Sequence, residues 1–140
     1  PDTQEILIDI EAELSSASSP ARAVLLSVFV HQISFDVSRF SVLVVLPFFD
    51  VLADETCGRI SEFAKKHGLD LDRTLFKIHP RTRVPSKRWQ KPCDGLNIET
   101  GTYPIELLIS LGHEFERAYF IDTSTNLKKI AKEKLFVDTV

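Results

Sequence analysis

One aspartate, Asp122, lies where an α/β protein is expected to carry out chemistry. It directly follows residues 118–121, a short apolar run with the composition of a buried strand. Ligands of open α/β sheets bind beyond the carboxyl ends of the strands, so a carboxylate at this point could contact one. The alternative is that Asp122 only caps a helix predicted to begin near Ser124. The sequence by itself leaves both interpretations open.

Five basic side chains are concentrated in a stretch without any acidic residue, and they are Arg81, Arg83, Lys87, Arg88 and Lys91. Because Trp89 lies among them, the stretch could neutralise and stack on a nucleic acid. Stretches of this kind are more often solvated, or they dock on an acidic neighbour. Arg81, Arg83, Lys87 and Arg88 are therefore candidates to bind phosphate or a partner.

Length and composition are those of one ordinary domain. The chain has 140 residues, of which 44% are hydrophobic and 26% are charged. Its formal net charge of −3 favours neither nucleic acid nor an acidic membrane surface as a general partner. No apolar run approaches the roughly 18 residues of a membrane span, so no membrane partner is expected.

The two cysteines, Cys57 and Cys93, are too few for a disulfide framework. They indicate a reducing compartment, which means an intracellular location in the cytoplasm or an organelle matrix. Cys57 falls on a predicted helix and is expected in the core.

The predicted elements alternate along most of the chain. Residues 41–46 form a continuous apolar run typical of a central parallel strand, and Pro47 ends it because proline cannot donate to the sheet. Ser19 and Pro20 are typical of a helix start. The other expected elements are a helix over 21–33 buried on most sides, a helix from Asp54 to about 67, a strand over 74–78, a loop over 79–101, a helix over 104–112, a strand over 118–121, a helix over 124–133 and an edge strand over 135–137.

The first segment remains ambiguous from its residues alone. Apolar residues at 6, 7, 10 and 14 suit an amphipathic helix, whereas residues 5–8 equally suit a strand followed by an acidic loop. In either case, strands alternating with helices predict a three-layer, doubly wound α/β fold of Rossmann-like type, with a parallel sheet and a single domain over residues 1–140.

Two fragments resemble motifs of the haloacid dehalogenase superfamily. Lys91-Pro92-Cys93-Asp94-Gly95-Leu96 resembles a lysine-proline-x-x-glycine-(Met or Leu) signature, whose lysine steadies the nucleophile and the phosphate. That signature belongs to the capless phosphatases acting on histidinol phosphate or heptose bisphosphate. Residues 120–127 resemble the acidic motif, in which a strand-end carboxylate binds Mg²⁺ and another acid lies four residues on.

The resemblance implies a haloacid dehalogenase-like fold without a cap domain. It places residues 6–14 on the nucleophile motif, which favours the strand over the helix there. Asp9 is then the nucleophile and a metal ligand, Glu11 is the acid and Lys91 assists catalysis. Asp122 and Asn126 take the remaining metal positions.

Several residues depart from the family pattern. Glu11 replaces an aspartate, and an acid misplaced by about 1 Å can lose on the order of 10²-fold in rate. Glu13 replaces a threonine and adds like charge near the phosphate position. Pro47 stands where a hydroxyl should hold the phosphate, and Asn126 replaces an acid. We therefore expect at best weak Mg²⁺ binding.

No zinc is expected, because only His79 and Cys93 are near the position of the zinc loop found in some relatives.

These departures predict a catalytically impaired pseudoenzyme that acts as a structural or interaction module, with protein partners in a larger assembly. One alternative is an active Mg²⁺-dependent phosphatase acting on a phosphorylated small molecule. Another is a protein that binds a phosphate ligand or RNA through residues 81–91.

Overall fold

The computed structural model describes residues 19–84, 93, 95–122 and 129–140, and these include a single five-stranded sheet. The strands are β1 (Val42–Val45), β2 (Thr74–Lys77), β3 (Asn97–Glu99), β4 (Phe115–Ile121) and β5 (Ala131–Val137). All neighbouring pairs are parallel, in the order β3-β2-β1-β4-β5. The chain therefore builds outward from β1 in both directions, which is the strand order of Rossmann-like folds. The predicted parallel α/β architecture is confirmed at this level.

The central strand β1 has the apolar sequence that its position requires. It is hydrogen-bonded on one side to β2 and on the other to β4, with Val45 in register with Lys77 and Phe120. Leu43 and Val44 point to opposite faces of the sheet, and both are completely buried. A parallel strand covered on both faces must be apolar at successive positions, which is why the sequence identified it.

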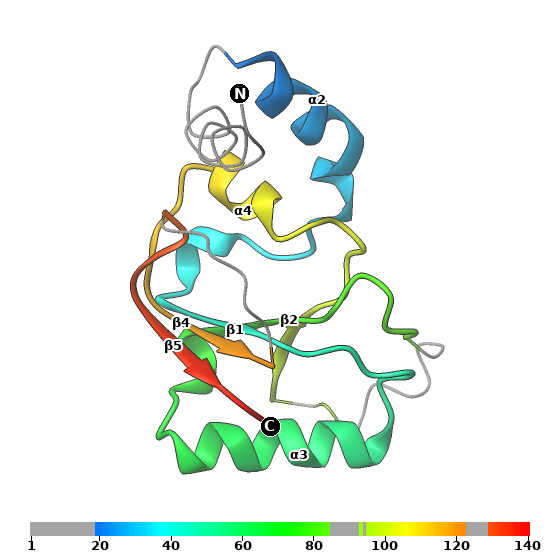
Figure 1. Cartoon of the computed structure of the whole chain (residues 1–140), viewed down its shortest axis with the longest axis vertical. Coiled ribbons are helices and arrows are strands. Elements are labelled where there is room, and N and C mark those ends of the chain that lie inside the picture. The colour runs from blue at the N-terminus through cyan, green and yellow to red at the C-terminus, as the bar shows by residue number, and fades with distance from the viewer. Residues whose placement is uncertain (1–18, 85–92, 94, 123–128) are drawn as a thin grey trace, which may run out of the picture.

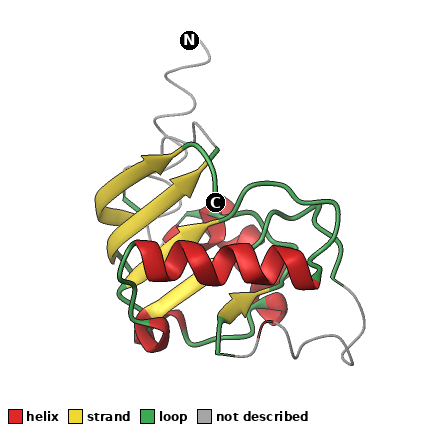
Figure 2. Cartoon of the chain, turned by 90° about the horizontal axis from the view of Figure 1, so that it is seen from below, coloured by secondary structure: helices red, strands yellow, loops and turns green. Residues whose placement is uncertain are grey.

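The helices cover both faces of the sheet and complete three layers (Figures 1 and 2). Helices α2 (Pro20–Phe29) and α4 (Glu106–Ser110) lie on one face, where Leu107 and Leu108 join a core with Leu43 and Phe120. Helix α3 (Asp54–Lys66) lies on the other face, where its buried side chains pack against β1, β2 and β4. Short 3₁₀ turns occupy Val30–Gln32, Val37–Arg39 and Leu71–Arg73.

The ends of α2 and α3 follow the signals in the sequence. Ser19 caps α2 by accepting a hydrogen bond from the backbone N–H of Arg22 (3.2 Å), and Pro20 is the first helical residue. Helix α3 has two acidic residues in its first turn and two lysines in its last turn, an arrangement that suits the helix dipole. Gly68 follows its end with a φ of +62°, in the left-handed region that favours glycine.

Three expected elements differ from the structure. Residues 97–99 form β3 inside the predicted loop. The helix expected over 124–133 is wrong from residue 131 onward, where β5 begins; residues 123–128 lie outside the described part. Strand β5 is longer than expected because it pairs with β4 along its whole length, and this pairing overrides the helix-forming sequence.

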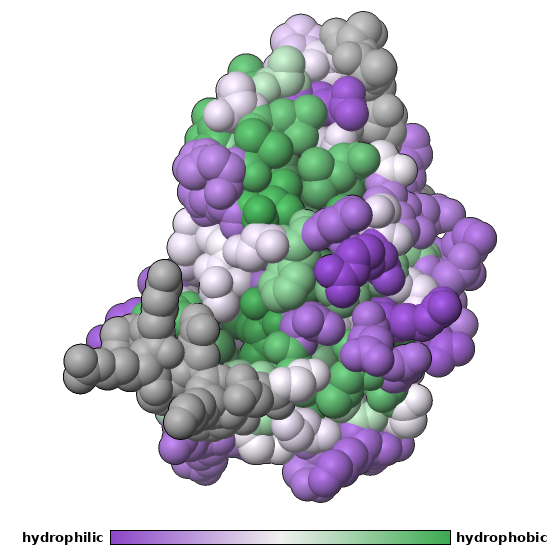
Figure 3. Space-filling view, turned by 180° about the vertical axis from the view of Figure 1, so that it is seen from behind, coloured by the Kyte–Doolittle hydropathy of each residue, from purple (hydrophilic) through white to green (hydrophobic). Residues whose placement is uncertain are grey.

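The sequence predicts that the helix over 21–33 is buried on most sides, and this prediction is wrong for α2. No residue of α2 is fully buried, and Val24 and Val28 are 61% and 48% exposed. Only one side of the helix, with Leu25, Leu26 and Phe29, packs against the core. Apolar surface is visible in Figure 3 in the upper part of the molecule, at the level of α2 and α4.

The two cysteines form a disulfide between α3 and the segment before β3. Cys57 and Cys93 are 36 residues apart in sequence, with their Cα atoms 5.2 Å apart. Cys57 is in the core, as predicted, but its pairing with Cys93 removes the basis for inferring a reducing compartment.

Among the described helices, none is long and apolar enough to cross a membrane.

Candidate functional site

A crevice opens beyond the carboxyl ends of β1, β2 and β4, next to the point where the strand order reverses. Its volume is about 510 Å³, within the range of small-molecule sites. Open α/β sheets bind their ligands at this position. The lining residues are Val45, Leu46, Pro47, Phe48, Lys77, Ile78, His79, Pro80, Pro104, Ile105, Glu106 and Asp122.

Asp122 is at the crevice, as the sequence predicted. It is exposed, and it is the first residue after β4. Its backbone N–H donates to the carbonyl of Val137 on the neighbouring strand (2.8 Å). Its φ of 49° is in the left-handed region, which is uncommon for a residue other than glycine and is often found at functional sites. The helix that Asp122 might cap lies outside the described residues.

The sequence interpretation missed a buried lysine in the same crevice. Lys77 is the last residue of β2, lines the crevice and is only 2% exposed. Its Nζ donates to the backbone carbonyls of Ile78 and Gly101, both at 2.9 Å, and lies 4.6 Å from the centre of the Tyr103 ring. Burial lowers the pKa of Lys77 to about 8, and the nearby charge of Glu99 opposes this shift.

Glu99 and Tyr103 surround Lys77 with further buried polar groups. Glu99 is the register partner of Lys77 on β3 and is completely buried. Its carboxylate accepts hydrogen bonds from the backbone N–H groups of Ser34 (2.8 Å) and Gly101 (3.3 Å). The hydroxyl of Tyr103 is buried and makes no hydrogen bond of good geometry with the described residues; burial, followed by the neighbouring Glu99 carboxylate, raises the pKa of this phenol.

The one signal that could have found this cluster is charge at the ends of otherwise apolar strands. Lys77 follows the apolar pair Leu75 and Phe76, and Glu99 follows Ile98. Buried charges are rare and are usually paired. Two charges of opposite sign at neighbouring strand ends therefore indicate either a functional site or a structural network.

The crevice has few groups that could hold a phosphate. Pro47, Pro80 and Pro104 have no backbone N–H, and no serine, threonine or glycine is found among the described residues of the lining. His79 is the remaining ionisable side chain on the β2 side; burial, followed by the charges of Arg81 and Lys77, lowers its pKa. It also makes an edge contact with the ring of Phe48, with 5.4 Å between ring centres.

The two described arginines of the basic stretch lie beside the crevice rather than in it. Arg81 is exposed, and its guanidinium lies 6.0 Å from the centre of the Phe48 ring. Arg83 is exposed and forms an isolated parallel bridge with Val51, while its side chain donates to the carbonyl of Asp50 (3.4 Å).

The other predicted site residues lie outside the described part of the chain. They are Asp9, Glu11, Lys87, Arg88, Lys91 and Asn126. Among the described residues, no group of three or more histidines, cysteines or acids is placed to hold a metal ion. Because two of the three predicted Mg²⁺ ligands are not described, weak Mg²⁺ binding stays a prediction.

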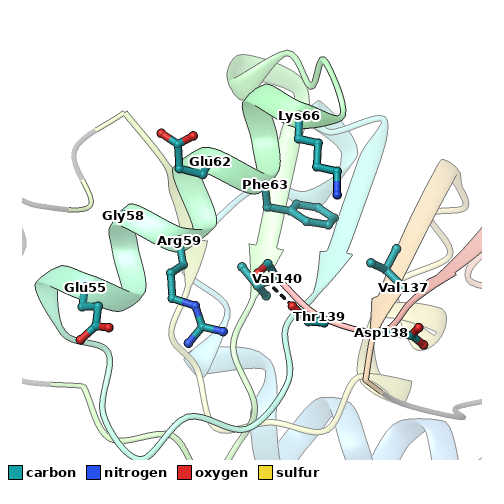
Figure 4. A pocket seen from close by; sticks show the side chains of 10 residues that line it. All are labelled: Glu55, Gly58, Arg59, Glu62, Phe63, Lys66, Val137, Asp138, Thr139 and Val140. Carbon is teal, nitrogen blue, oxygen red and sulfur yellow. Dashed lines mark hydrogen bonds between the residues drawn. The ribbon is translucent and has the colours of Figure 1, made fainter.

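A second cavity, of about 670 Å³, lies between α3 and the segment that follows β5. Figure 4 shows its lining: Arg59 and Phe63 extend from α3 toward this segment, whereas Glu62 points away from it. The charged side chains of α3 at this cavity alternate in sign and are exposed, so none has the special environment of Lys77. We therefore place the candidate site at the carboxyl-edge crevice, although the second cavity is larger.

Comparisons with protein-family models, with curated proteins and with solved structures find no match to this chain. Any functional conclusion therefore rests on the residues and on their geometry.

Proposed function

We propose that this chain is a haloacid dehalogenase-like domain with an impaired phosphatase site, acting as a structural or interaction module in a larger assembly. The observation that carries the proposal is the composition of the crevice. Phosphoryl transfer needs an in-line nucleophile, a set of donors around the phosphate and an acid for the leaving group. Among the residues that the structure describes, the crevice offers three prolines and no hydroxyl where those donors are needed.

Charge in the crevice supports the same conclusion. Glu106 and Asp122 both line it, and two carboxylates oppose the entry of a phosphate dianion. Lys77 could compensate only in part, because two of the three N–H donors of its ammonium are already bonded to backbone carbonyls. Removing one preorganised donor alone can cost several kcal/mol of transition-state stabilisation.

An active Mg²⁺-dependent phosphatase is the alternative that one observation favours. Asp122 is exposed at the end of β4 and lines the crevice, as a metal-binding carboxylate should. With Asp9 it would supply two carboxylates, and a bound Mg²⁺ would offset part of the repulsion described above.

The test is hydrolysis of p-nitrophenyl phosphate with and without Mg²⁺, by the unmodified chain and by Asp9→Asn and Asp122→Asn. We expect no turnover above background in any of them. Asp72→Asn is the matched control, because Asp72 is an exposed acid on a 3₁₀ turn far from the carboxyl ends. Turnover at an ordinary enzyme rate that depends on Mg²⁺ and is lost in Asp9→Asn but kept in Asp72→Asn would overturn the proposal.

A further inference from the structure

The crevice contains one nucleophile that phosphatase chemistry does not use, the amine of Lys77. A lysine is normally exposed and protonated, and in that form it has no free lone pair. Lys77 is 2% exposed and is one of the residues that line a crevice with room for a small molecule. Its position at a strand end beside the reversal of strand order is where a reacting group is expected.

We propose that the amine of Lys77 condenses with a small, mainly apolar aldehyde or ketone in this crevice to form an imine. An apolar substrate body suits the lining, which includes Phe48, Ile105 and three prolines. The same lining disfavours a phosphorylated carbonyl compound, for the reasons given above.

Burial favours the neutral form of the Lys77 amine, whereas the charge of Glu99 and the ring of Tyr103 favour the ammonium. A neutral amine has two N–H donors and one lone pair, and the carbonyls of Ile78 and Gly101 accept two N–H groups at 2.9 Å. With a pKa of about 8, about one Lys77 side chain in ten is neutral at pH 7, against about one in several thousand for an ordinary lysine. The ionisable groups around it are Glu99 and Tyr103 on one side, and His79, Glu106 and Asp122 in the crevice.

The reaction needs no oxidant, reductant or cofactor. The nitrogen lone pair attacks the carbonyl carbon, the π electrons move to oxygen, and oxygen takes up a proton to give a carbinolamine. Nitrogen loses one proton and the hydroxyl takes up another, the nitrogen lone pair then expels water as the carbon–oxygen bond breaks, and loss of the last proton on nitrogen leaves the imine. His79 lines the crevice and is the group that we assign to accept and return these protons, for which its Nδ1 must give up the hydrogen bond that it accepts from the backbone N–H of Arg81 (3.1 Å).

The experiment treats the whole chain with butanal and sodium cyanoborohydride, which reduces an imine to a stable secondary amine, and maps the modified lysines by mass spectrometry. Lys65 and Lys66, exposed on α3, are internal references in the same sample. At pH 7 we expect Lys77 to be modified at least about tenfold faster than either reference. Its rate should also saturate with butanal concentration, because the crevice binds the aldehyde before it reacts, whereas the reference rates should rise linearly.

Two controls separate this proposal from a purely structural role of Lys77. In urea, the three lysines should react at similar rates. In the folded chain, His79→Gln should slow the modification of Lys77 several-fold, whereas His31→Gln, at an exposed site on a 3₁₀ turn, should not. A Lys77 that stays unmodified in the folded chain while Lys65 and Lys66 react would overturn the proposal, and so would modification without saturation. The outcome does not depend on phosphatase activity, so the two proposals can fail separately.

Discussion

At the scale of single residues, the carboxyl edge of the sheet carries one candidate site residue that was predicted, Asp122, and one that was missed, Lys77. Asp122 could be predicted because an acid directly after an apolar run stands out in the sequence. Lys77 gives a weaker signal, because a lysine that ends an apolar strand normally extends its ammonium into water. Its burial depends on Gly101 and Tyr103, which are 24 and 26 residues further along the chain, and no local pattern shows that they close over it.

Gly101 is the residue that allows this closure. A Cβ atom at this position would lie 2.5 Å from the backbone oxygen of Gln32 and 2.7 Å from the ring of Tyr103. We therefore expect Gly101→Ala to lower the free energy of unfolding by about 1–3 kcal/mol, the usual cost of overpacking. Urea unfolding followed by circular dichroism would measure it.

Gly58 provides the matched control for this substitution. It lies inside α3, and a Cβ atom there would meet nothing within 4 Å. Gly58→Ala should raise the free energy of unfolding by about 0.5–1 kcal/mol, because alanine favours the helix. Equal effects of the two substitutions would contradict the close packing seen around Gly101.

At the scale of elements, strands buried on both faces could be predicted, whereas of the two edge strands β3 was missed and only the end of β5 was predicted. Residues 131–134 alternate alanine, lysine and glutamate, and all of these form helices readily. They become a strand because β5 pairs with β4 from Ala131 to Val137. Side-chain pairs between the two strands then form, with Lys132 3.1 Å from Glu116 and Arg117 3.4 Å from Glu133. Such pairs exist only after the strands have met.

The strand pairing within the sheet also limits where a further strand could be added. Strand β4 is hydrogen-bonded to β1 and to β5, and β1 is hydrogen-bonded to β2 and to β4. A strand formed by residues 5–8 would have to lie outside β3 or β5. Beside β5 it would be two strand spacings, or roughly 10 Å, from β4, at the limit of what Asp9 and Asp122 need to share one metal ion. That Asp9 lies close enough to Asp122 to share a metal ion stays a prediction, and the strand pairing leaves little room for it.

The disulfide joins α3 to the segment before β3. Reduction, or the double variant Cys57→Ser and Cys93→Ser, should lower the free energy of unfolding by about 2–4 kcal/mol, because the bond restricts the unfolded chain over a 36-residue separation. The measurement is urea unfolding with and without a thiol reductant. The double variant should not respond to the reductant. Two titratable thiols in the native, air-oxidised protein would show that the bond does not form.

At the scale of the whole molecule, charge and apolar surface are unevenly distributed. The exposed valines of α2 lie on the outer layer of the face that α2 shares with α4, and Arg81 and Arg83 are exposed beside the crevice. Net charge did not predict this, since the chain as a whole carries −3. What the sequence could predict was the local excess of bases over residues 81–91, and the structure places its first two members on the surface.

The exposed arginine pair leads to a prediction about salt. If Arg81 and Arg83 contact two phosphates of single-stranded RNA, the slope of log affinity against log salt should fall by about 1.4 in Arg81→Ala plus Arg83→Ala, since each contact contributes about 0.7. The matched control is Lys65→Ala plus Lys66→Ala, which removes the same charge from exposed positions on α3. Fluorescence anisotropy of a labelled oligouridine, measured at several salt concentrations, would report both slopes.

Equal slopes in the two variants would mean that only net charge attracts the RNA. An unchanged slope in the arginine variant would leave an acidic protein as the partner to test next, because a protein surface has no condensed counterions of this kind to release. The arginines would then act through short-range pairing, and the Debye length of about 10 Å at 0.1 M salt would set the range of that attraction.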